Sequence, residues 1–355
     1  MQAVVLAGGS GTRLHPLTMS TPKPMLPLFS KPVIEHSIEL LRQHGADEVI
    51  IALSSASQEI AEHLGDGSAW GLDIAYSFED EPKGTAGAVK LVQPRIKGTF
   101  IVISGDAVTD FDLRAAVEFH RRKSAIATLL LHEIDEPSDF GIVQQDPDGR
   151  ITRLLEKPKS SEVFSNTINT GIYILEPEAL SSIPYFTTCD FARDVFPRLL
   201  RNLEPVYGCL LPGYWCDVGN LIQYRNAHFD ALMGKAHVEI SGTEVEPGVW
   251  IGDDAEVHQT AELAGPLFLG TAADVRKNAS LRPFTVVGHN SLVDEAAWVA
   301  RSIVGSHAFI GRGTRVSDCV IGSGYRVPEQ RSIRNQLVME DEDPQIAIRT
   351  AEACA

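Results

Sequence analysis

The sequence predicts a two-part α/β protein: a mostly parallel, Rossmann-like sheet with helices on both faces, followed by a parallel β-helix. Strand-like and helix-like segments alternate over the first part of the chain, and a six-residue aliphatic period begins near Trp250. A chain of 355 residues is also too long for one ordinary core. We expect a first domain at 1–233, a linker at 234–248, a β-helix at 249–328 and an acidic tail at 329–355.

The first domain is predicted from alternating apolar runs. The expected elements are strand, helix, strand, helix and strand at residues 4–6, 32–44, 49–53, 58–64 and 100–103. In the first helix the apolar residues share one face, Pro32 suits the first turn and Gly45 suits the end. Strands separated by helices of this length imply a mostly parallel sheet, whose ligands bind at the carboxyl ends of the strands.

The second domain is predicted from a period of six. Branched aliphatic residues recur in phase at Ile251, Val257, Leu263, Leu269, Val275, Leu281, Val287, Val293 and Val299. Most have a small residue two positions earlier, and the register slips by one at Val304. One aliphatic and one small inward residue per six is the hexapeptide β-helix pattern, in which each short strand forms one wall of a prism.

One wall of this prism is predicted to be apolar on its outer side. Residues next to the inward aliphatics point outward, because side chains alternate along a strand. Trp250, Phe268 and Val286 therefore stack on one outer face, whereas the other two faces carry charged and polar residues. We expect the apolar face to pack against the first domain or against another copy in a homo-oligomer. Scattered exposed apolar residues are the alternative.

Composition limits the partners and the compartment. The 31 basic and 47 acidic residues give a net charge of −16, which argues against nucleic acid or an anionic membrane as partner. No apolar run approaches the roughly 20 residues that span a bilayer. The five cysteines form neither a disulfide framework nor a CxxC metal site, and the N-terminus has no cationic leader. These features predict a cytoplasmic protein.

The opening segment contains cations and no acids. No Asp or Glu precedes Glu35, although Arg13, Lys23 and Lys31 do. A segment of this kind in an acidic protein suits a bound polyanion. A chance fluctuation in a Pro-rich loop is the alternative.

A glycine-rich loop in this segment follows the first strand, with the sequence Ala-Gly-Gly-Ser-Gly-Thr-Arg-Leu at residues 7–14. Its glycines let backbone N–H groups approach phosphate oxygens, and two prolines restrict the backbone around Lys23. The loop is neither a Walker A motif nor a dinucleotide fingerprint. It predicts a triphosphate site with fixed cations.

A series of motifs resembles the sugar-nucleotide pyrophosphorylases. They lie at residues 8–14, 15–18, 22–25, 81–87, 105–106, 140–143, 156–158, 169–171 and 214–219. With the hexapeptide region they cover almost the whole chain in order. The resemblance implies an enzyme that joins a nucleoside triphosphate to a sugar 1-phosphate and releases pyrophosphate. Within the family, the chain is most similar to mannose-1-phosphate guanylyltransferases, including forms that carry a left-handed β-helix.

The resemblance also implies a role for each motif. The nucleotide would be bound by Leu6, Ala7, Gly8, Gly9, Gly11, Thr12, Arg13, Glu79, Gly84 and Thr85. The sugar 1-phosphate would be bound by Gly141, Glu156, Lys157, Asn169 and Thr170, with Lys157 on the phosphate and Glu156 on sugar hydroxyls. Arg13, Lys23, Asp106 and Asp217 would be catalytic, and the two aspartates would ligate Mg²⁺. Without the resemblance, a lone Asp after a strand is more often a turn or cap residue.

The nucleobase is inferred from Glu79. Guanine presents two N–H donors on one edge and a carboxylate accepts both, whereas uracil and thymine alternate donor and acceptor and suit an amide better. An acidic Glu79 agrees with GTP, and mannose 1-phosphate is then the expected second substrate; an exposed acidic turn is the alternative for this residue. Glucose 1-phosphate with dTTP, UTP or ATP remains open.

Two rival functions come from other classes. A non-catalytic sugar-nucleotide-binding regulatory subunit would lack charge at the reacting centre, yet Arg13, Lys23, Asp106 and Asp217 are all present. A bifunctional enzyme whose β-helix also transfers acyl groups would need a base, for which His258, His289 and His307 are available. Nothing else in the sequence indicates a coenzyme A pocket.

Overall fold

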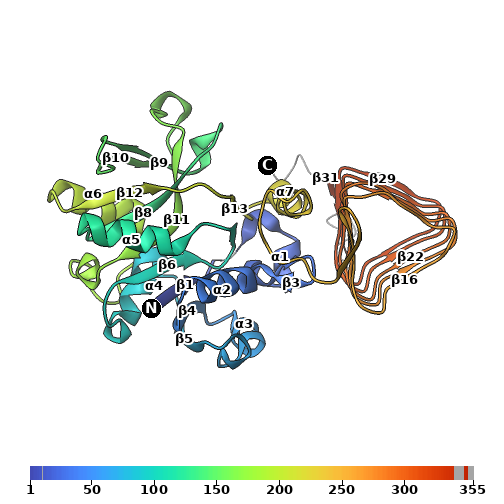
Figure 1. The fold of residues 1–355 in the computed structure, drawn as a ribbon, viewed down its shortest axis with the longest axis horizontal. Helices are drawn as coiled ribbons and strands as arrows, with labels where there is room; N and C mark the ends of the chain where they lie inside the picture. The colour runs from blue at the N-terminus through green and yellow to red at the C-terminus, as the bar shows by residue number, and fades with distance from the viewer. Residues whose placement is uncertain (10, 340–347, 351–355) are drawn as a thin grey trace. The chain divides into compact units, whose positions relative to one another are not determined.

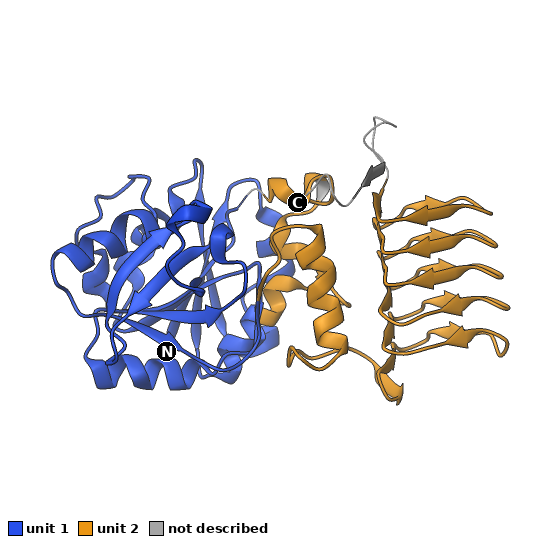
Figure 2. Ribbon diagram, turned by 90° about the horizontal axis from the view of Figure 1, so that it is seen from above, with its two compact units in different colours: residues 1–9, 37–215 blue, residues 10–36, 216–355 orange. Residues whose placement is uncertain are grey.

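The computed structural model describes residues 1–9, 11–339 and 348–350. The chain forms two compact units, residues 1–9 with 37–215 and residues 10–36 with 216–355 (Figure 2). The chain therefore passes between units three times: inside the glycine-rich loop after Gly9, then after His36, and again after Trp215. The acidic run of the tail, residues 340–343, lies outside the described residues. No helix in the described ranges is both long enough and apolar enough to cross a bilayer.

The first unit is built on one large sheet (Figure 1). Its parallel part is formed by β6 (Phe100–Ser104), β1 (Gln2–Leu6), β4 (Glu48–Ser54) and β5 (Asp73–Glu79), in that order. Leu6 pairs with Ala52 on one side and with Ser104 on the other, and Ser54 pairs with Glu79. The carboxyl ends of these four strands consequently meet at one edge, as expected for a parallel ligand-binding sheet.

Beyond β6 the sheet becomes mixed. β11 (Thr167–Leu175) pairs antiparallel with β6, and both β9 (Gly141–Gln145) and β8 (Ala127–Glu133) pair antiparallel with β11. β10 (Ile151–Glu156) pairs antiparallel with β9, whereas β12 (Val206–Leu210) pairs parallel with β8. The register of β11 against β8 shifts between Asn169 and Tyr173, and Gly171 in this bulge has a φ of 80°. Only glycine adopts such a φ without strain, so the bulge is encoded locally.

The predicted helices are present. Those expected at 32–44 and 58–64 are α2 (Val33–Gln43) and α3 (Gln58–Leu64). The remaining helices of the first unit are α4 (Gly84–Val92), α5 (Leu113–Lys123) and α6 (Phe196–Arg201), the last preceded by a π-helical turn, η8 (Phe191–Val195). The core beneath them is formed by buried residues including Val102, Leu129 and Phe191.

The second unit contains a parallel β-helix with three walls. The first wall is β15 (Val249–Ile251), β18 (Leu267–Leu269), β21 (Thr285–Val287), β24 (Ile303–Val304), β27 (Val320–Ile321) and β30 (Gln336–Val338). The second is β16 (Glu256–Val257), β19 (Asp274–Val275), β22 (Leu292–Val293), β25 (Phe309–Ile310) and β28 (Arg326–Val327). The third is β17 (Glu262–Leu263), β20 (Ser280–Leu281), β23 (Trp298–Ala300), β26 (Arg315–Ser317) and β29 (Ser332–Arg334).

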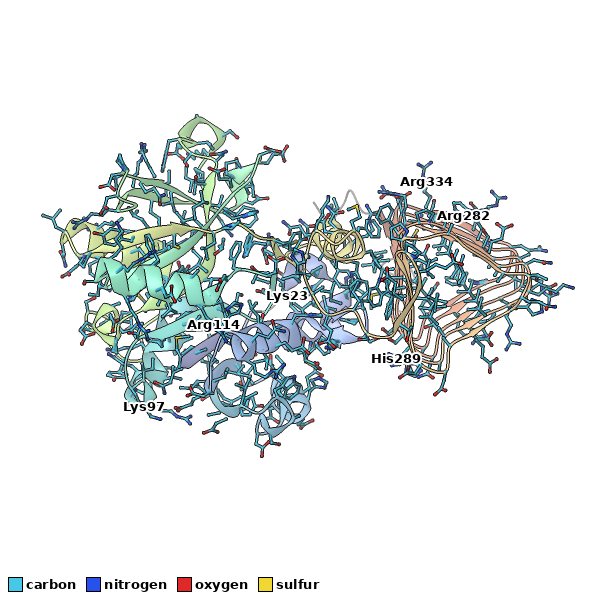
Figure 3. The ribbon with its side chains drawn as sticks, viewed as in Figure 1. Lys23, Lys97, Arg114, Arg282, His289 and Arg334 are labelled. Atoms are coloured by element: carbon cyan, nitrogen blue, oxygen red, sulfur yellow. The ribbon has the colours of Figure 1, made fainter. Side chains whose placement is uncertain are left out.

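The predicted inward positions form the core of the prism. Val275, Leu281, Val287 and Val293 are fully buried, and Val287 pairs with Val304 at the predicted one-residue slip. The outer side of the third wall carries charged residues, including Arg334 and the ion pair of Arg282 with Glu262 (Figure 3). The hexapeptide pattern is confirmed by this arrangement.

Strand pairing extends beyond both ends of the predicted β-helix. The strands β29 and β30 continue the stacking past residue 328, because Ile333 and Leu337 still supply the apolar positions. At the other end β14 (Thr243–Glu246) pairs antiparallel with β15, within the segment expected to be a linker. At the far end of the same wall β31 (Ile348–Thr350) pairs antiparallel with β30.

The apolar face is covered within the chain itself. Phe268 and Val286 are 0% and 2% exposed, and the Phe29 ring lies 5.1 Å from the Phe268 ring. On the same side, Phe229 of α7 (Leu221–Leu232) lies 5.0 Å from Phe284. Phe29 and Phe229 come from the segment assigned to the first domain, so that part of the packing expectation is confirmed. Phe268 and Val286 are therefore covered by this chain, whereas Trp250, the third residue of the predicted face, is only partly buried. A homo-oligomer stays a prediction.

Candidate functional site

The glycine-rich loop begins at the carboxyl edge of the sheet. The Ala7 N–H donates to the Ala52 carbonyl at 2.9 Å, and the Gly105 N–H donates to the Leu6 carbonyl at 2.9 Å. A Cβ at Gly8 would lie 3.4 Å from the Ser54 nitrogen, and Gly9 is exposed. Leu6, Ala7 and Gly8 are thus held between two neighbouring strands, where backbone N–H groups can meet phosphate oxygens.

Glu79 ends the neighbouring strand β5. Its Oε2 accepts from the Lys83 N–H at 3.3 Å, while its buried Oε1 has no hydrogen-bond partner among the described residues. Burial raises the pKa of this carboxyl. A half-buried carboxylate with an unmatched oxygen does not behave as an exposed acidic turn. It is a place where a ligand donor would be stabilised.

The start of α4 carries the next two predicted nucleotide residues. Gly84 has a φ of 71°, and a Cβ there would lie 2.5 Å from the Cys189 carbonyl oxygen. The Thr85 hydroxyl donates to Asp190 Oδ2 at 2.8 Å and accepts from the Phe191 N–H at 3.0 Å. Thr85 is exposed, but its hydroxyl is held by Asp190 and Phe191.

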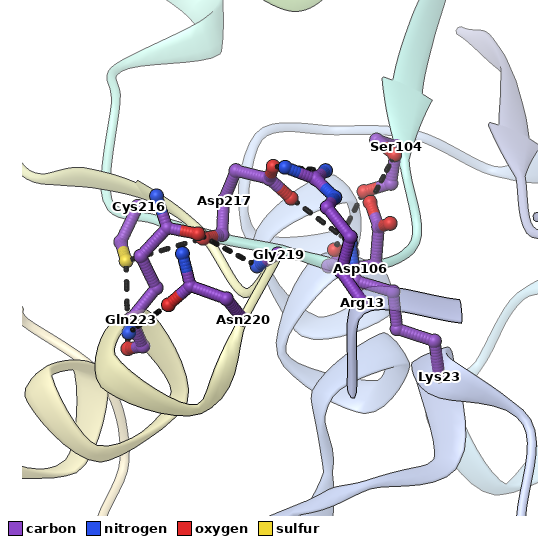
Figure 4. Close-up of polar contacts among 10 residues, drawn as sticks. Arg13, Lys23, Ser104, Asp106, Cys216, Asp217, Gly219, Asn220 and Gln223 are labelled. Carbon is purple, nitrogen blue, oxygen red and sulfur yellow. Dashed lines mark hydrogen bonds and ion pairs between the residues drawn. The ribbon is translucent and has the colours of Figure 1, made fainter. Parts of the chain in front are cut away.

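Asp106 lies just beyond β6. The Ser104 hydroxyl donates a short hydrogen bond to Asp106 Oδ1 (Figure 4). Ser104 was not predicted as a site residue, although its spacing of two from Asp106 at a strand end was visible in the sequence.

Three predicted sugar residues are brought together on adjacent antiparallel strands. Gly141 of β9 pairs with Glu156 of β10 on one side and with Asn169 of β11 on the other. A Cβ at Gly141 would lie 2.6 Å from Glu156 Oε2, so a side chain there would displace the Glu156 carboxylate. Asn169 Nδ2 donates to the Tyr173 hydroxyl at 3.0 Å. Tyr173 was missed by the sequence analysis, because the bulge at Gly171 is what brings it beside Asn169.

Burial raises the pKa of Glu156, and the charge of Asp190 raises it further. Lys157 and Arg193 act in the opposite direction. Asp190 and Arg193 were not predicted either. They lie in the π-helical turn region, for which the sequence has no periodic signal.

Lys157 and Thr170 differ in their surroundings. Lys157 is exposed and has a φ of 48°, with its N–H donating to the Phe140 carbonyl at 3.1 Å. A lysine in this conformation is uncommon, and such outliers concentrate at functional positions. The Thr170 hydroxyl is buried and donates to the Leu130 carbonyl at 2.7 Å. The structure therefore does not bring the Thr170 side chain to the Asn169 cluster.

The second unit holds the other charged residues of the prediction. Lys23 Nζ lies 3.0 Å from Asp217 Oδ1, and Arg13 Nη2 lies 3.7 Å from Asp217 Oδ2 (Figure 4). The Lys23 side chain is 8% exposed and that of Arg13 57% exposed. A fixed, nearly buried lysine and a more accessible arginine converge on one carboxylate.

The glycine-rich loop reaches this cluster through Gly11 and Thr12. Gly11 has a φ of 61°, and a Cβ there would lie 3.0 Å from the Cβ of Lys23. The Thr18 hydroxyl donates to the Gly11 carbonyl at 2.8 Å. Thr12 begins a single 3-10 turn that ends at Leu14 and carries Arg13. Gly11 thus allows the loop to pass directly against Lys23.

Gly219 and Gln223 support Asp217 from the other side. A Cβ at Gly219 would lie 2.7 Å from Asp217 Oδ2 and 2.8 Å from Gln223 Oε1. Gln223 Oε1 accepts from the Gly219 N–H at 3.1 Å, and Asn220 caps α7 by accepting from the Gln223 N–H at 2.9 Å. Gln223 was missed, although an Asn followed three residues later by Gln is a helix-start signal.

The carboxylates of Asp106 and Asp217 could serve as Mg²⁺ ligands, but they could not form a structural metal site made of protein ligands alone. The described residues contain no group of three or more His, Cys, Asp or Glu side chains placed to hold a metal ion. Mg²⁺ commonly takes one or two carboxylates and completes its shell with water and substrate phosphates. Asp106 and Asp217 match that chemistry, whereas a structural zinc site would need four protein ligands.

Comparison with known proteins identifies the family. The nucleotidyl transferase family profile matches residues 2–233. A UTP–glucose-1-phosphate uridylyltransferase from Synechocystis sp. is 36% identical, covering 92% of this chain and 88% of its own. Mannose-1-phosphate guanylyltransferase 1 from Arabidopsis thaliana is 30% identical, covering 93% of each chain.

Among solved structures, HddC from Yersinia pseudotuberculosis has a TM-score of 0.56 at 27% identity, covering 64% of this chain and 97% of that one. The resemblance seen in the sequence motifs is confirmed. The chain belongs to the nucleotidyl transferase family and is an enzyme that transfers a nucleotide to a sugar 1-phosphate.

Proposed function

We propose that this enzyme transfers GMP from GTP to mannose 1-phosphate, forming GDP-mannose and releasing pyrophosphate. The observation that carries the choice of base is the Glu79 carboxylate, whose buried Oε1 lacks a hydrogen-bond partner among the described residues. The two N–H donors on one edge of guanine match the two oxygens of a carboxylate. Uracil and thymine would set a carbonyl oxygen against it.

The sugar 1-phosphate is proposed to bind at the Gly141, Glu156 and Asn169 cluster. Glu156 accepts hydrogen bonds from sugar hydroxyls, and Asn169 adds a polar contact. The exposed Lys157 side chain, next to Glu156 in sequence, neutralises the phosphate of this substrate. Holding the sugar and its phosphate at two fixed points orients the attacking oxygen.

The reaction is proposed to be a direct in-line displacement. A phosphate oxygen of the sugar 1-phosphate attacks the α-phosphorus of the nucleotide, and pyrophosphate leaves without a covalent enzyme intermediate. Arg13 and Lys23 stabilise the charge on the triphosphate, and the backbone of the glycine-rich loop donates to its oxygens.

Asp106 and Asp217 would hold Mg²⁺, which supplies Lewis-acid stabilisation of the phosphate oxygens. Lys23, at 3.0 Å, and Arg13, at 3.7 Å, hold the Asp217 carboxylate in place before the nucleotide arrives. Lysine carries three donors, so Lys23 can hold Asp217 and still donate to a phosphate. The Ser104 hydroxyl orients the Asp106 carboxylate in the same way from its own side.

A second candidate is transfer of UMP to glucose 1-phosphate. It is favoured by the 36% identity to the uridylyltransferase from Synechocystis, which exceeds the 30% identity to the guanylyltransferase from Arabidopsis. The Glu79 carboxylate opposes it, because an amide would suit uracil better.

Pyrophosphate release distinguishes the two candidates. The purified full-length chain is assayed with Mg²⁺ and with GTP, ATP, CTP, UTP or dTTP, each against mannose 1-phosphate and glucose 1-phosphate. We expect the highest kcat/KM for GTP with mannose 1-phosphate. A higher kcat/KM for UTP with glucose 1-phosphate would replace the proposal by the second candidate.

A further inference from the structure

Residues 83–87, at the start of α4, include two residues predicted to bind the nucleotide and are called the nucleotide loop below. The segment at residues 187–191 is hydrogen-bonded directly to this loop. The Cys189 N–H donates to the Lys83 carbonyl at 2.8 Å, and the Cys189 carbonyl accepts from the N–H groups of Ala86 and Gly87, both at 3.0 Å. A Cβ at Gly87 would lie 2.7 Å from the Thr187 carbonyl oxygen. The two backbones are therefore in contact along several residues, with no room for a side chain between them.

Thr85 and Asp190 add a side-chain link to this contact. The Thr85 hydroxyl donates to Asp190 Oδ2 at 2.8 Å and accepts from the Phe191 N–H at 3.0 Å. A hydrogen bond to an ionised carboxylate is stronger than one between neutral groups. The hydroxyl is thus a bridge between the nucleotide loop and the beginning of the π-helical turn.

Asp190 also shapes that turn. Its Oδ1 accepts from the N–H groups of Ala192 and Arg193 at 2.9 and 3.1 Å, so the residue caps η8 with one oxygen and holds Thr85 with the other. π-Helical turns are rare and recur at functional sites. Loss of the cap or of the hydroxyl would release the same segment.

The other side of this segment borders the sugar cluster. The Phe191 ring lies 5.2 Å and the Phe196 ring 4.9 Å from the Tyr173 ring. The Tyr173 hydroxyl accepts from Asn169 Nδ2 at 3.0 Å. A movement of the turn would therefore be transmitted by packed rings to Asn169.

We propose that Asp190, acting through Thr85, is a positioning residue that ties the sugar-phosphate pocket to the nucleotide loop, so that the two substrates bind with positive coupling. This coupling rests on the proposed function. It adds that binding of the nucleotide prepares the sugar cluster for the second substrate. A nucleotide that fixes the loop at residues 83–87 fixes the segment at 187–191 with it. The sugar 1-phosphate then binds to a sugar cluster whose residues are already in position.

The first test compares Thr85→Val with Thr85→Ser. Valine is close in shape to threonine and removes both hydrogen bonds of the hydroxyl, whereas serine keeps the hydroxyl. The dissociation constant of mannose 1-phosphate is measured by calorimetry without nucleotide and with a non-hydrolysable α,β-methylene GTP analogue. We expect the analogue to tighten mannose 1-phosphate binding about tenfold in the wild type and in Thr85→Ser, and by less than about twofold in Thr85→Val. Equal tightening in all three proteins would overturn the proposal.

The second test uses Asp190→Asn and reads a pH profile. Burial and the Asp190 charge both raise the pKa of Glu156, while Lys157 and Arg193 lower it, and the buried Tyr173 hydroxyl is the remaining titratable group beside it. Glu156 accepts hydrogen bonds as a carboxylate, so kcat/KM for mannose 1-phosphate falls as the pH drops through its pKa. Removing the Asp190 charge should move this acid limb to lower pH, because that charge raises the pKa of Glu156; the shift tests whether Asp190 acts on the sugar cluster. An unmoved limb would contradict the assignment.

The proposed reaction and the proposed coupling can be contradicted separately. If the wild type releases no pyrophosphate with any pair of substrates, the proposed reaction is wrong. If it turns over but its binding coupling survives in Thr85→Val, only the positioning role of Asp190 is wrong. Circular dichroism of each variant establishes that it is folded, and Asp190→Asn provides the independent readout if Thr85→Val is not.

Discussion

At the scale of single residues, the site depends on carboxylates whose surroundings differ. Glu79 and Glu156 are partly buried, so their pKa values are raised, and Asp217 is held between two cations. The motifs predicted which residues carry charge. They did not predict that Glu79 Oε1 lacks a hydrogen-bond partner among the described residues, or that the Thr170 hydroxyl donates to the Leu130 carbonyl. Both depend on how distant strands pair.

Replacement of Asp106 tests the proposed metal ligand. Asp106→Asn keeps the size of the side chain and its hydrogen-bonding capacity but removes the charge, so we expect kcat to fall by about 10³-fold in Mg²⁺ with an unchanged melting temperature. Ser104→Ala, which removes only the orienting hydroxyl, should cost about tenfold. Steady-state kinetics over a Mg²⁺ titration measure both. An Asp106→Asn enzyme with near-wild-type kcat would exclude the role.

Glu79 predicts a pH dependence of GTP binding. The carboxylate accepts both guanine donors only when ionised, and burial raises its pKa, so the KM for GTP should rise as the pH falls through that raised value. Glu79→Gln has no titrating group, and its KM for GTP should be about tenfold higher and independent of this ionisation. The wild type and the variant are compared from pH 5 to 8. Parallel profiles would show that Glu79 does not read the base.

At the scale of elements, helices and strands could be predicted from the sequence where apolar residues recur at a regular spacing. The helix at 58–64, three of the four strands of the parallel part of the sheet and the six-residue repeat were predicted from their apolar residues, whereas β5 was not predicted. The π-helical turn at 191–195 and the bulge at Gly171 have no period, since one is fixed by the Asp190 cap and the other by a single positive φ. Three of the missed residues, Tyr173, Asp190 and Arg193, lie in or beside these irregular elements.

Gly219 is predicted to be intolerant of a side chain. A Cβ there would press on Asp217 and Gln223, at 2.7 and 2.8 Å, so Gly219→Ala should displace the Asp217 carboxylate from Lys23. We expect kcat to fall by about 10²-fold, since an ångström of misplacement costs about that much. Gly98→Ala is the matched control, because a Cβ there meets no described atom within 4 Å. Equal activity of the two variants would show that Asp217 is not held as described.

His228 on α7 is predicted to make stability pH-dependent. Its Nε2 accepts from the Phe29 N–H at 3.2 Å and its Nδ1 lies 3.0 Å from the Tyr224 carbonyl, so the neutral ring is the form that fits. Burial lowers its pKa from 6.5 to about 4. The unfolded chain therefore binds a proton that the folded chain does not, and stability falls as the pH drops from 6.5 toward 4, by up to about 3 kcal/mol.

Urea unfolding of wild type and His228→Gln at pH 7 and pH 4.5 measures this contribution. The glutamine variant is expected to lose less stability on acidification than the wild type. An equal loss in both would mean that another group is responsible.

At the scale of the whole molecule, the β-helix and part of the candidate site lie in the same compact unit. The segment with Arg13 and Lys23 and the segment with Asp217 are in the same compact unit as the prism. Contacts within that unit include the Phe29 and Phe268 rings and a hydrogen bond from Arg225 Nη1 to the Asp318 carbonyl at 2.8 Å. Sequence periodicity revealed the prism and its apolar outer face, but not which residues cover that face, because the covering side chains lie far away in the chain.

Truncation of Phe268 tests whether the prism supports catalysis. Phe268→Ala removes a fully buried ring beside Phe29, and we expect a loss of about 3–5 kcal/mol in unfolding free energy together with reduced kcat. Trp298→Ala, on another wall and partly exposed, should leave kcat unchanged. A Phe268→Ala enzyme with wild-type kcat would show that the β-helix does not influence the Asp217 cluster.

The central claim is that a sugar phosphate attacks the α-phosphorus of GTP directly. It is tested by following two labels in a single turnover with excess enzyme, Mg²⁺ and mannose 1-phosphate. The account predicts that label from [α-³²P]GTP appears only in GDP-mannose and that label from [γ-³²P]GTP appears only in pyrophosphate. Label retained on the protein, or α-label appearing in free GMP or GDP, would contradict it.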